Sequence, residues 1–159
     1  MHKFDLKNKT AVITGGAQGF GLNIAKKFLN SGASVNIWDI DIKQLKKAKN
    51  SIKNNNLSYQ VVDVTNYRNV QKIVKEITKK SKIDILINSA GITGPTTQLW
   101  HYKIKDWNKI IEINLNGTFY CCKSIVPHMI KNKYGRIVNI ASVSGKDGNA
   151  NASAYSSSK

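Results

Sequence analysis

The sequence predicts an α/β fold, a doubly wound parallel sheet formed as one domain from residues 1–159. Two observations predict this fold. Short apolar runs alternate along the chain with longer segments whose apolar residues recur at helical spacing, and small or polar residues follow each apolar run. Runs that are apolar on both faces are typical of strands covered by helices on both sides of the sheet.

A glycine-rich turn begins at the last residue of the first expected strand, residues 10–15. The turn comprises Gly15, Gly16, Ala17, Gln18, Gly19, Phe20 and Gly21, and a helix follows it. Small residues let backbone N–H groups approach a pyrophosphate, and the helix N-terminus adds the positive end of its dipole. Because the turn lies between a strand and a helix, we interpret it as a dinucleotide site, with a purely structural turn as the alternative.

The second expected strand, residues 34–39, ends in an acidic residue, Asp39. An acidic side chain about twenty residues after such a glycine turn can accept hydrogen bonds from the ribose hydroxyls of NAD. It would repel the additional phosphate of NADP, and Gln18 supplies no cation for that phosphate. The sequence therefore favours NAD over NADP. In the alternative interpretation Asp39 caps the next helix, residues 42–54, a role that Asp41 could fill equally well.

Two further strands are expected to end at the same edge of the sheet. In the third, residues 58–64, Asp63 either contacts the adenine or caps the following helix, and the residues leave both roles open. The fourth, residues 83–88, is nearly all apolar, as a central parallel strand should be. Small residues at 89–91 leave room for a cofactor after this strand.

A long helical segment, residues 105–131, precedes the last strand. Asn114 is a polar residue on its apolar stripe, so it either bonds to the backbone or belongs to the site, and the spacing alone favours the structural role. Pro127 predicts a kink or break in this helix. The adjacent Cys121 and Cys122 are expected to be packing groups, because sequence neighbours rarely form a good disulfide, and a reduced, cytoplasmic setting fits them.

A serine, a tyrosine and a lysine near the end of the sequence suit proton transfer. The fifth strand, residues 135–141, brings Ser142 to the same edge as the earlier strand ends. Tyr155 and Lys159 are four residues apart in an expected helix, which places the phenol and the ammonium on one face. A neighbouring cation favours the phenolate, and a nearby hydroxyl can hold a carbonyl oxygen. Such groups can move a proton on or off an oxygen while a hydride moves elsewhere.

Along its whole length the chain resembles the short-chain dehydrogenase/reductase family. The matching segments are residues 14–21, residues 88–91 (with serine at 89 where a second asparagine is more usual), residues 113–117, Ser142, and the Tyr155 and Lys159 pair. The resemblance implies a Rossmann-like sheet truncated to five strands in the order 3-2-1-4-5. It also implies an NAD-dependent oxidoreductase that interconverts a secondary alcohol and a ketone.

The resemblance assigns roles to individual residues. Tyr155 would exchange a proton with the substrate oxygen, Lys159 would assist it and bind the nicotinamide ribose, and Ser142 would orient the carbonyl. Asn114, the fourth catalytic residue, would hold a water behind Lys159. Contacts to the cofactor are implied at Gly15, Gln18, Gly19, Phe20, Gly21, Asp39, Ile40, Asp63, Val64, Asn88, Ala90, Gly91, Tyr155 and Lys159. No metal site is expected.

The substrate and partners follow from the same resemblance. Residues 88–95 and 148–151 resemble members that act either on 3-oxoacyl-carrier-protein substrates or on sugars and sugar acids. The sequence supports these two substrate classes nearly equally. The preference for NAD leans away from fatty-acid reduction, which usually draws on NADPH. The expected partners are a small carbonyl or alcohol substrate and, in the parent enzyme, identical subunits of a homodimer or homotetramer.

In this family the chain normally continues well past the lysine. The resemblance therefore implies a truncated or incomplete domain whose C-terminal part is missing, and the 159-residue piece is expected to be poorly soluble and inactive. The alternative function is a non-catalytic fragment that binds the dinucleotide and does not turn over.

The net charge of +16, from 25 basic and 9 acidic residues, raises the possibility of a nucleic-acid partner. The basic residues are nearly all lysines, spread over the expected helix faces without interleaved aromatic residues. We therefore interpret the charge as a compositional bias and expect no nucleic-acid partner. No apolar run is long enough to cross a bilayer and the first residues contain no apolar signal core, so a cytoplasmic protein without membrane contact is expected.

Overall fold

The computed structural model describes residues 4–159 and confirms the predicted parallel α/β fold. Five parallel strands lie in the predicted order β3-β2-β1-β4-β5. They are β1 (Thr10–Thr14), β2 (Ser34–Asp39), β3 (Leu57–Val61), β4 (Ile85–Asn88) and β5 (Arg136–Asn139). Thr14 lies opposite both Trp38 and Asn88, so the pairing register brings the carboxyl ends of the strands to one edge.

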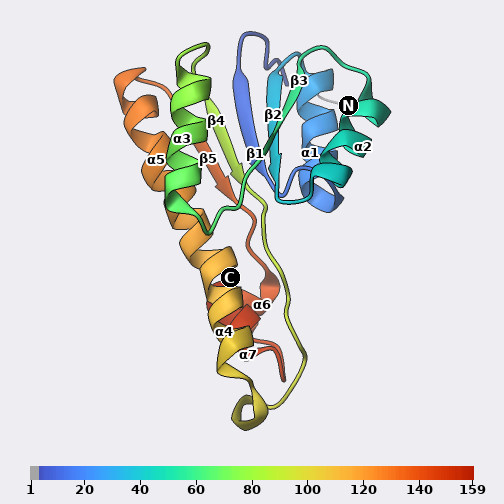
Figure 1. Cartoon of the computed structure of the whole chain (residues 1–159), viewed down its shortest axis with the longest axis vertical. Helices are drawn as coiled ribbons and strands as arrows, with labels where there is room; N and C mark the ends of the chain where they lie inside the picture. Colours follow the sequence, from blue (N-terminus) through green and yellow to red (C-terminus); the bar gives the residue numbers. More distant parts are fainter. Residues whose placement is uncertain (1–3) are drawn as a thin grey trace.

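Helices cover both faces of this sheet, as Figure 1 shows. One layer contains α1 (Gly19–Asn30) and α2 (Ile42–Ile52), and the other contains α3 (Tyr67–Thr78) and α5 (Gly117–Lys131). Successive residues of β1 pack against the two layers alternately: Ile13 packs in the cluster with α1 and α2, and Val12 packs in the cluster with α3 and α5. This alternation explains why the strands are apolar on both faces.

The predicted long helix consists of three consecutive pieces. α4 (Ile104–Ile111) leads into a π-helical turn, η2 (Glu112–Asn116), which leads into α5. The predicted break at Pro127 is wrong, because α5 runs through this residue to Lys131. A proline in a helix removes one backbone hydrogen bond, and the packing of α5 against α3 and β4 outweighs that loss.

Short helices lie beyond the carboxyl ends of the strands (Figure 1). They are η1 (Leu99–His101), α6 (Val143–Asp147) and α7 (Ser153–Ser158). α7 packs against both α4 and α6, so these neighbours decide where the side chains of α7 lie. Three strands are shorter than predicted: β3 ends at Val61, β4 begins only at Ile85, and β5 spans only Arg136–Asn139.

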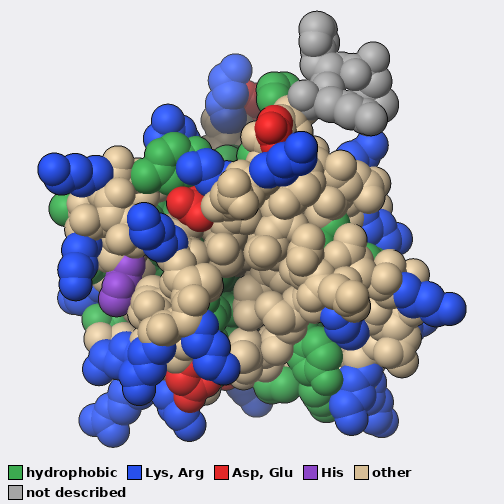
Figure 2. Space-filling view, turned by 90° about the horizontal axis from the view of Figure 1, so that it is seen from above, with side chains coloured by type: hydrophobic (Ala, Val, Ile, Leu, Met, Phe, Trp, Pro, Cys, Tyr) green, Lys and Arg blue, Asp and Glu red, His purple; other side chains and the backbone are tan. Residues whose placement is uncertain are grey.

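The two cysteines pack as predicted: Cys121 is fully buried in the cluster under α3 and α5, and Cys122 packs against it. Figure 2 shows basic side chains spread around the periphery of one face, where they do not gather into a single stripe. None of the helices within residues 4–159 combines the length and the apolar character that a bilayer-spanning segment needs.

Candidate functional site

A groove of about 550 Å³ runs along the carboxyl edge of the sheet. The segments that follow all five strands contribute to its lining. It brings together most of the predicted site residues: Gly15, Gln18, Gly19, Phe20, Asp39, Ile40, Asp63, Val64, Ala90, Gly91, Ser142, Tyr155 and Lys159. Three predicted residues, Gly21, Asn88 and Asn114, are not part of the lining.

The glycine turn forms a close cradle between β1 and α1. Gly15 has φ +61°, and a Cβ there would lie 2.9 Å from the backbone N and Cα of Ala90. A Cβ on Gly21 would collide with the carbonyl oxygen of Gly15, so the helix can pass this close to the turn only without a side chain. The N-cap residue Gln18 makes no side-chain cap, and the first turn of α1 contains no acidic residue. The cradle and the uncapped helix N-terminus fit a pyrophosphate.

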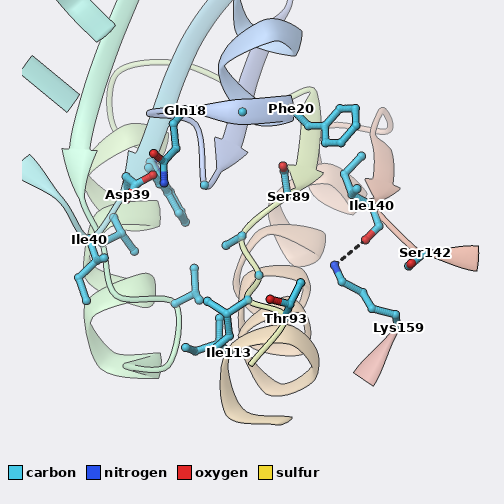
Figure 3. A pocket seen from close by; sticks show the side chains of 18 of the residues that line it. Gln18, Phe20, Asp39, Ile40, Ser89, Thr93, Ile113, Ile140, Ser142 and Lys159 are labelled. Carbon is cyan, nitrogen blue, oxygen red and sulfur yellow. Dashed lines mark hydrogen bonds between the residues drawn. The ribbon is translucent and has the colours of Figure 1, made fainter. Parts of the chain in front are cut away.

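Asp39 lies at one end of the groove beside Gln18, as Figure 3 shows. Its carboxylate accepts two long hydrogen bonds, from the backbone N–H of Ala17 at 3.3 Å and from that of Asp41 at 3.2 Å. The alternative that Asp39 caps α2 is wrong, because Asp41 accepts the bonds from the first turn of that helix. The Asp39 carboxylate retains lone pairs for further donors.

Asp63 lines the groove near the same end, beside Val64. Its Oδ1 accepts bonds from the backbone N–H of Thr65 at 2.9 Å and from the Thr65 hydroxyl at 2.7 Å. The alternative that Asp63 caps α3 is wrong, because Asn66 is the N-cap and accepts from the N–H of Asn69.

The opposite end of the groove holds Ser142 and Lys159 (Figure 3), together with Tyr155. Ser142 Oγ accepts the backbone N–H of Ser144 at 3.2 Å, which leaves its own proton free to donate. Lys159 Nζ donates to the carbonyl oxygen of Ile140 at 2.9 Å and lies 6.0 Å from the centroid of the Tyr155 ring. A hydroxyl, a phenol and an ammonium therefore share one end of the groove.

Asn114 is buried in the η2 turn directly behind this end. Its Oδ1 accepts the N–H of Ile92 at 2.9 Å, and its Nδ2 donates to the carbonyl oxygen of Ile92 at 2.9 Å and to Ser158 Oγ at 2.8 Å. A Cβ on Gly91 would lie 3.2 Å from both Asn114 Oδ1 and Lys159 Nζ. The asparagine thus makes the backbone bonds that its spacing favoured and also lies close to the lysine.

Asn88 points away from the groove. Its Nδ2 donates to Asn139 Oδ1 at 2.9 Å and to Cys122 Sγ at 3.4 Å. Burial raises the pKa of the Cys122 thiol, which the hydrogen bond from Asn88 partly opposes, so the sulfur stays protonated at neutral pH. At the end of β1, Thr14 Oγ1 accepts the backbone N–H groups of Ser89 and Ala90, each at 3.1 Å, and so fixes the segment that leaves β4.

Sequence reasoning missed several lining residues: Trp38, Val62, Ser89, Ile92, Thr93, Ile113, Ile140 and Ala141. Six of these eight residues directly precede or follow a predicted site residue, so adjacency to such a residue was the available signal. Over the described residues, 4–159, no three or more His, Cys, Asp or Glu side chains come together as a metal site would need.

Comparisons with known proteins agree with this geometry. The family model described as short chain dehydrogenase matches residues 9–159. The 2-dehydro-3-deoxy-L-rhamnonate dehydrogenase (NAD(+)) of Sphingomonas sp. (strain SKA58) is 43% identical over 152 residues, which cover 95% of this chain and 60% of the relative. The 3-oxoacyl-[acyl-carrier-protein] reductase FabG of Chlamydia pneumoniae is 37% identical over 157 residues, which cover 97% of this chain and 63% of the relative.

A solved structure with the same fold is that of NAD+-bound xylitol dehydrogenase. It aligns with a TM-score of 0.93 at 32% identity, over 97% of this chain and 60% of that one. The chain therefore spans about 60% of the length of these relatives.

Proposed function

This chain belongs to the short chain dehydrogenase family, and from that premise we propose that it carries the cofactor site and catalytic groups of an NAD-dependent oxidoreductase. The enzyme interconverts a secondary alcohol and a ketone. The observation that carries the proposal is a single groove with an acidic residue, Asp39, at one end and Ser142, Tyr155 and Lys159 at the other.

The residues present fit a nicotinamide dinucleotide. The cradle at Gly15 and the uncapped N-terminus of α1 suit its pyrophosphate. Asp39 would accept bonds from the adenosine ribose, and Ile40 and Val64 would pack against the adenine. Ala90 and Gly91 leave space for the remainder of the cofactor.

The charge at the adenosine end supports NAD over NADP. Asp39 would repel an additional phosphate on the ribose. Among the described residues that line the groove, Lys159 alone has a cationic side chain, and Figure 3 places it at the end remote from Asp39. The relative from Sphingomonas, whose name specifies NAD(+), supports the same choice.

The catalytic groups act on the substrate oxygen. The bound dinucleotide supplies or accepts the hydride. Ser142, held by the N–H of Ser144, donates its proton to the substrate oxygen and orients it. Tyr155 gives or takes the proton at that oxygen, and the Lys159 ammonium stabilises the negative charge that develops on the phenol. The bond to Ile140 holds this ammonium in place.

For the substrate we propose a sugar or sugar acid, with a 3-oxoacyl thioester as the second class. Both classes occur among the relatives, and the proposed preference for NAD favours the first. We further propose that the complete enzyme is an oligomer of identical subunits in the cytoplasm.

Cofactor titration followed by turnover tests the proposal on the 159-residue chain, and turnover there would contradict the expectation from the family resemblance that this piece is inactive. NADH should bind more tightly than NADPH, and Asp39→Ala should reduce that difference. Reduction of NAD should then be followed with sugar acids and with 3-hydroxyacyl thioesters as substrates. Tyr155→Phe should lower kcat by about 10²- to 10⁴-fold without abolishing NADH binding.

The outcomes separate the alternatives. Binding of NADH without turnover of either substrate class would support the non-catalytic dinucleotide-binding alternative. Equal affinity for NADH and NADPH would contradict the role of Asp39. Unchanged turnover in Tyr155→Phe would contradict the role of the phenol.

A further inference from the structure

We infer that Ser158 is a positioning residue of this site, because it fixes helix α7 to the π-helical turn η2. α7 carries Tyr155 and leads directly into Lys159. The catalytic consequence of this inference rests on the proposed function, whereas the hydrogen-bonded connection between the two helical elements does not.

The connection passes through one buried hydroxyl. Ser158 Oγ accepts a bond from Asn114 Nδ2 at 2.8 Å and donates to the carbonyl oxygen of Tyr155 at 2.8 Å. The exposed fraction is 7% for Ser158 and 4% for Asn114, so water cannot readily replace either partner. The other bonds of the Asn114 side chain go to the backbone of Ile92. One asparagine thus joins η2, the segment after β4 and α7.

A hydroxyl near a helix end often bonds only to its own helix, and that local role is the simpler explanation of Ser158. The other serines of α7 argue against it. Ser153 and Ser156 have buried hydroxyls that lack a hydrogen-bond partner within residues 4–159, and Ser157 is exposed. Ser158 differs from all three because its hydroxyl also accepts a bond from a distant element, 44 positions away in the sequence.

The length of α7 explains why such a connection matters. The helix has six residues, and helices of this length are marginally stable by themselves. Its position therefore depends on tertiary contacts with α4 and α6 and on this side-chain bond. Lys159 is the next residue, so a displacement at Ser158 moves its ammonium relative to the phenol of Tyr155. Misplacement of catalytic groups by about 1 Å can lower a rate about a hundredfold.

Hydrogen exchange tests the connection without any need for activity. Ser158→Ala removes one of the two acceptors of Asn114 Nδ2, and Ser157→Ala is the matched control in the same helix. Ser158→Ala should speed amide exchange about tenfold across residues 153–159 and at Ile92, and Ser157→Ala should leave it unchanged. Equal exchange in the two variants would overturn the inference.

Kinetics test the consequence. In Ser158→Ala kcat should fall about ten- to a hundredfold, with a smaller change in the affinity for NADH, whereas Ser157→Ala should match the unmodified chain. The double variant Asn114→Ala/Ser158→Ala should lower kcat by less than the product of the two single effects, because each single variant already removes the Asn114–Ser158 bond. A double variant whose loss in kcat equals the product of the two single losses would overturn the positioning role, and so would an unchanged kcat in Ser158→Ala. If the unmodified chain shows no turnover, the catalytic part of the proposed function fails for this chain, while hydrogen exchange still decides whether Ser158 holds α7.

Discussion

The glycine cradle makes a quantitative prediction for Gly21→Ala. A Cβ at this position would lie 2.9 Å from the carbonyl carbon of Gly15 and 3.1 Å from the Cα of Gly16, and closer still to the Gly15 oxygen. Carbon atoms pack at about 3.5–4.0 Å, so α1 and the turn must separate by roughly half an ångström or more. Overpacking costs about 1–3 kcal/mol, and rigid backbone neighbours place this site at the upper end.

The higher helix propensity of alanine offsets about 1 kcal/mol of that cost. The expected net loss is therefore about 2 kcal/mol in the free energy of unfolding, measured by urea denaturation, and it should be accompanied by at least about tenfold weaker NADH binding. Lys26→Ala is the matched control, because Lys26 lies on the exposed face of the same helix. If the unfolding free energy of Gly21→Ala lies within about 0.5 kcal/mol of that of the unmodified chain and NADH binds as tightly, the close contact between α1 and the turn does not exclude a side chain at Gly21.

Three further predictions concern the scaffold of the site. Thr14→Val removes the acceptor of two backbone N–H groups and should cost about 2 kcal/mol in urea unfolding, whereas Thr10→Val, on the same strand, should cost much less. Asp41→Ala removes the cap of α2 and should cost about 1 kcal/mol while leaving the affinity for NADH unchanged, and weaker NADH binding would contradict this assignment. Burial, and to a smaller extent Cys122, raises the pKa of the Cys121 thiol from 9.0 to about 12. Above pH 9 the unfolded state loses the Cys121 proton, whereas the folded state keeps it. The contribution of this thiol to the free energy of unfolding is therefore complete below pH 9, and it should decline by about 1.4 kcal/mol per pH unit as the pH rises toward 12. The unfolding free energy of Cys121→Ala should fall less steeply over this range, and parallel pH curves would contradict the argument.

The sequence allowed a good prediction of which segments meet at the groove. In a parallel sheet all strands end at one edge, so a residue that follows any strand is placed near residues that follow the others. Gly15, Asp39 and Ser142 come together for this reason. The two open alternatives for Asp39 and Asp63 needed the structure, because an acidic residue before a helix is compatible with both capping and binding.

Side-chain direction was harder to predict than position. Asn88 ends β4 at the expected edge, but its side chain points toward Asn139 and Cys122. Successive residues of a strand point to opposite sides of the sheet. A prediction that is wrong by one position therefore places a side chain in the groove when it lies against the helix layer. The π-helical turn at Asn114 was not predicted either, because five residues are too few for a change of period to show in the sequence.

The two ends of the groove are stabilised in different ways, and they should respond differently to mutation. The Asp39 end is built from backbone: strands in register, a glycine turn and the start of α1, so added side-chain atoms should damage it most. The end with Tyr155 and Lys159 lies beyond the sheet on short helices, where side-chain hydrogen bonds through Asn114 and Ser158 supplement helix packing. That end should be sensitive to the removal of single hydroxyl or amide groups. The experiment compares variants that add a methyl group at the Asp39 end with variants that remove a polar group at the Tyr155 and Lys159 end. NADH affinity and kcat, measured for each variant, would show whether the two ends differ in this way. Deletions at the Tyr155 and Lys159 end that weaken NADH binding as much as they lower kcat would contradict this difference.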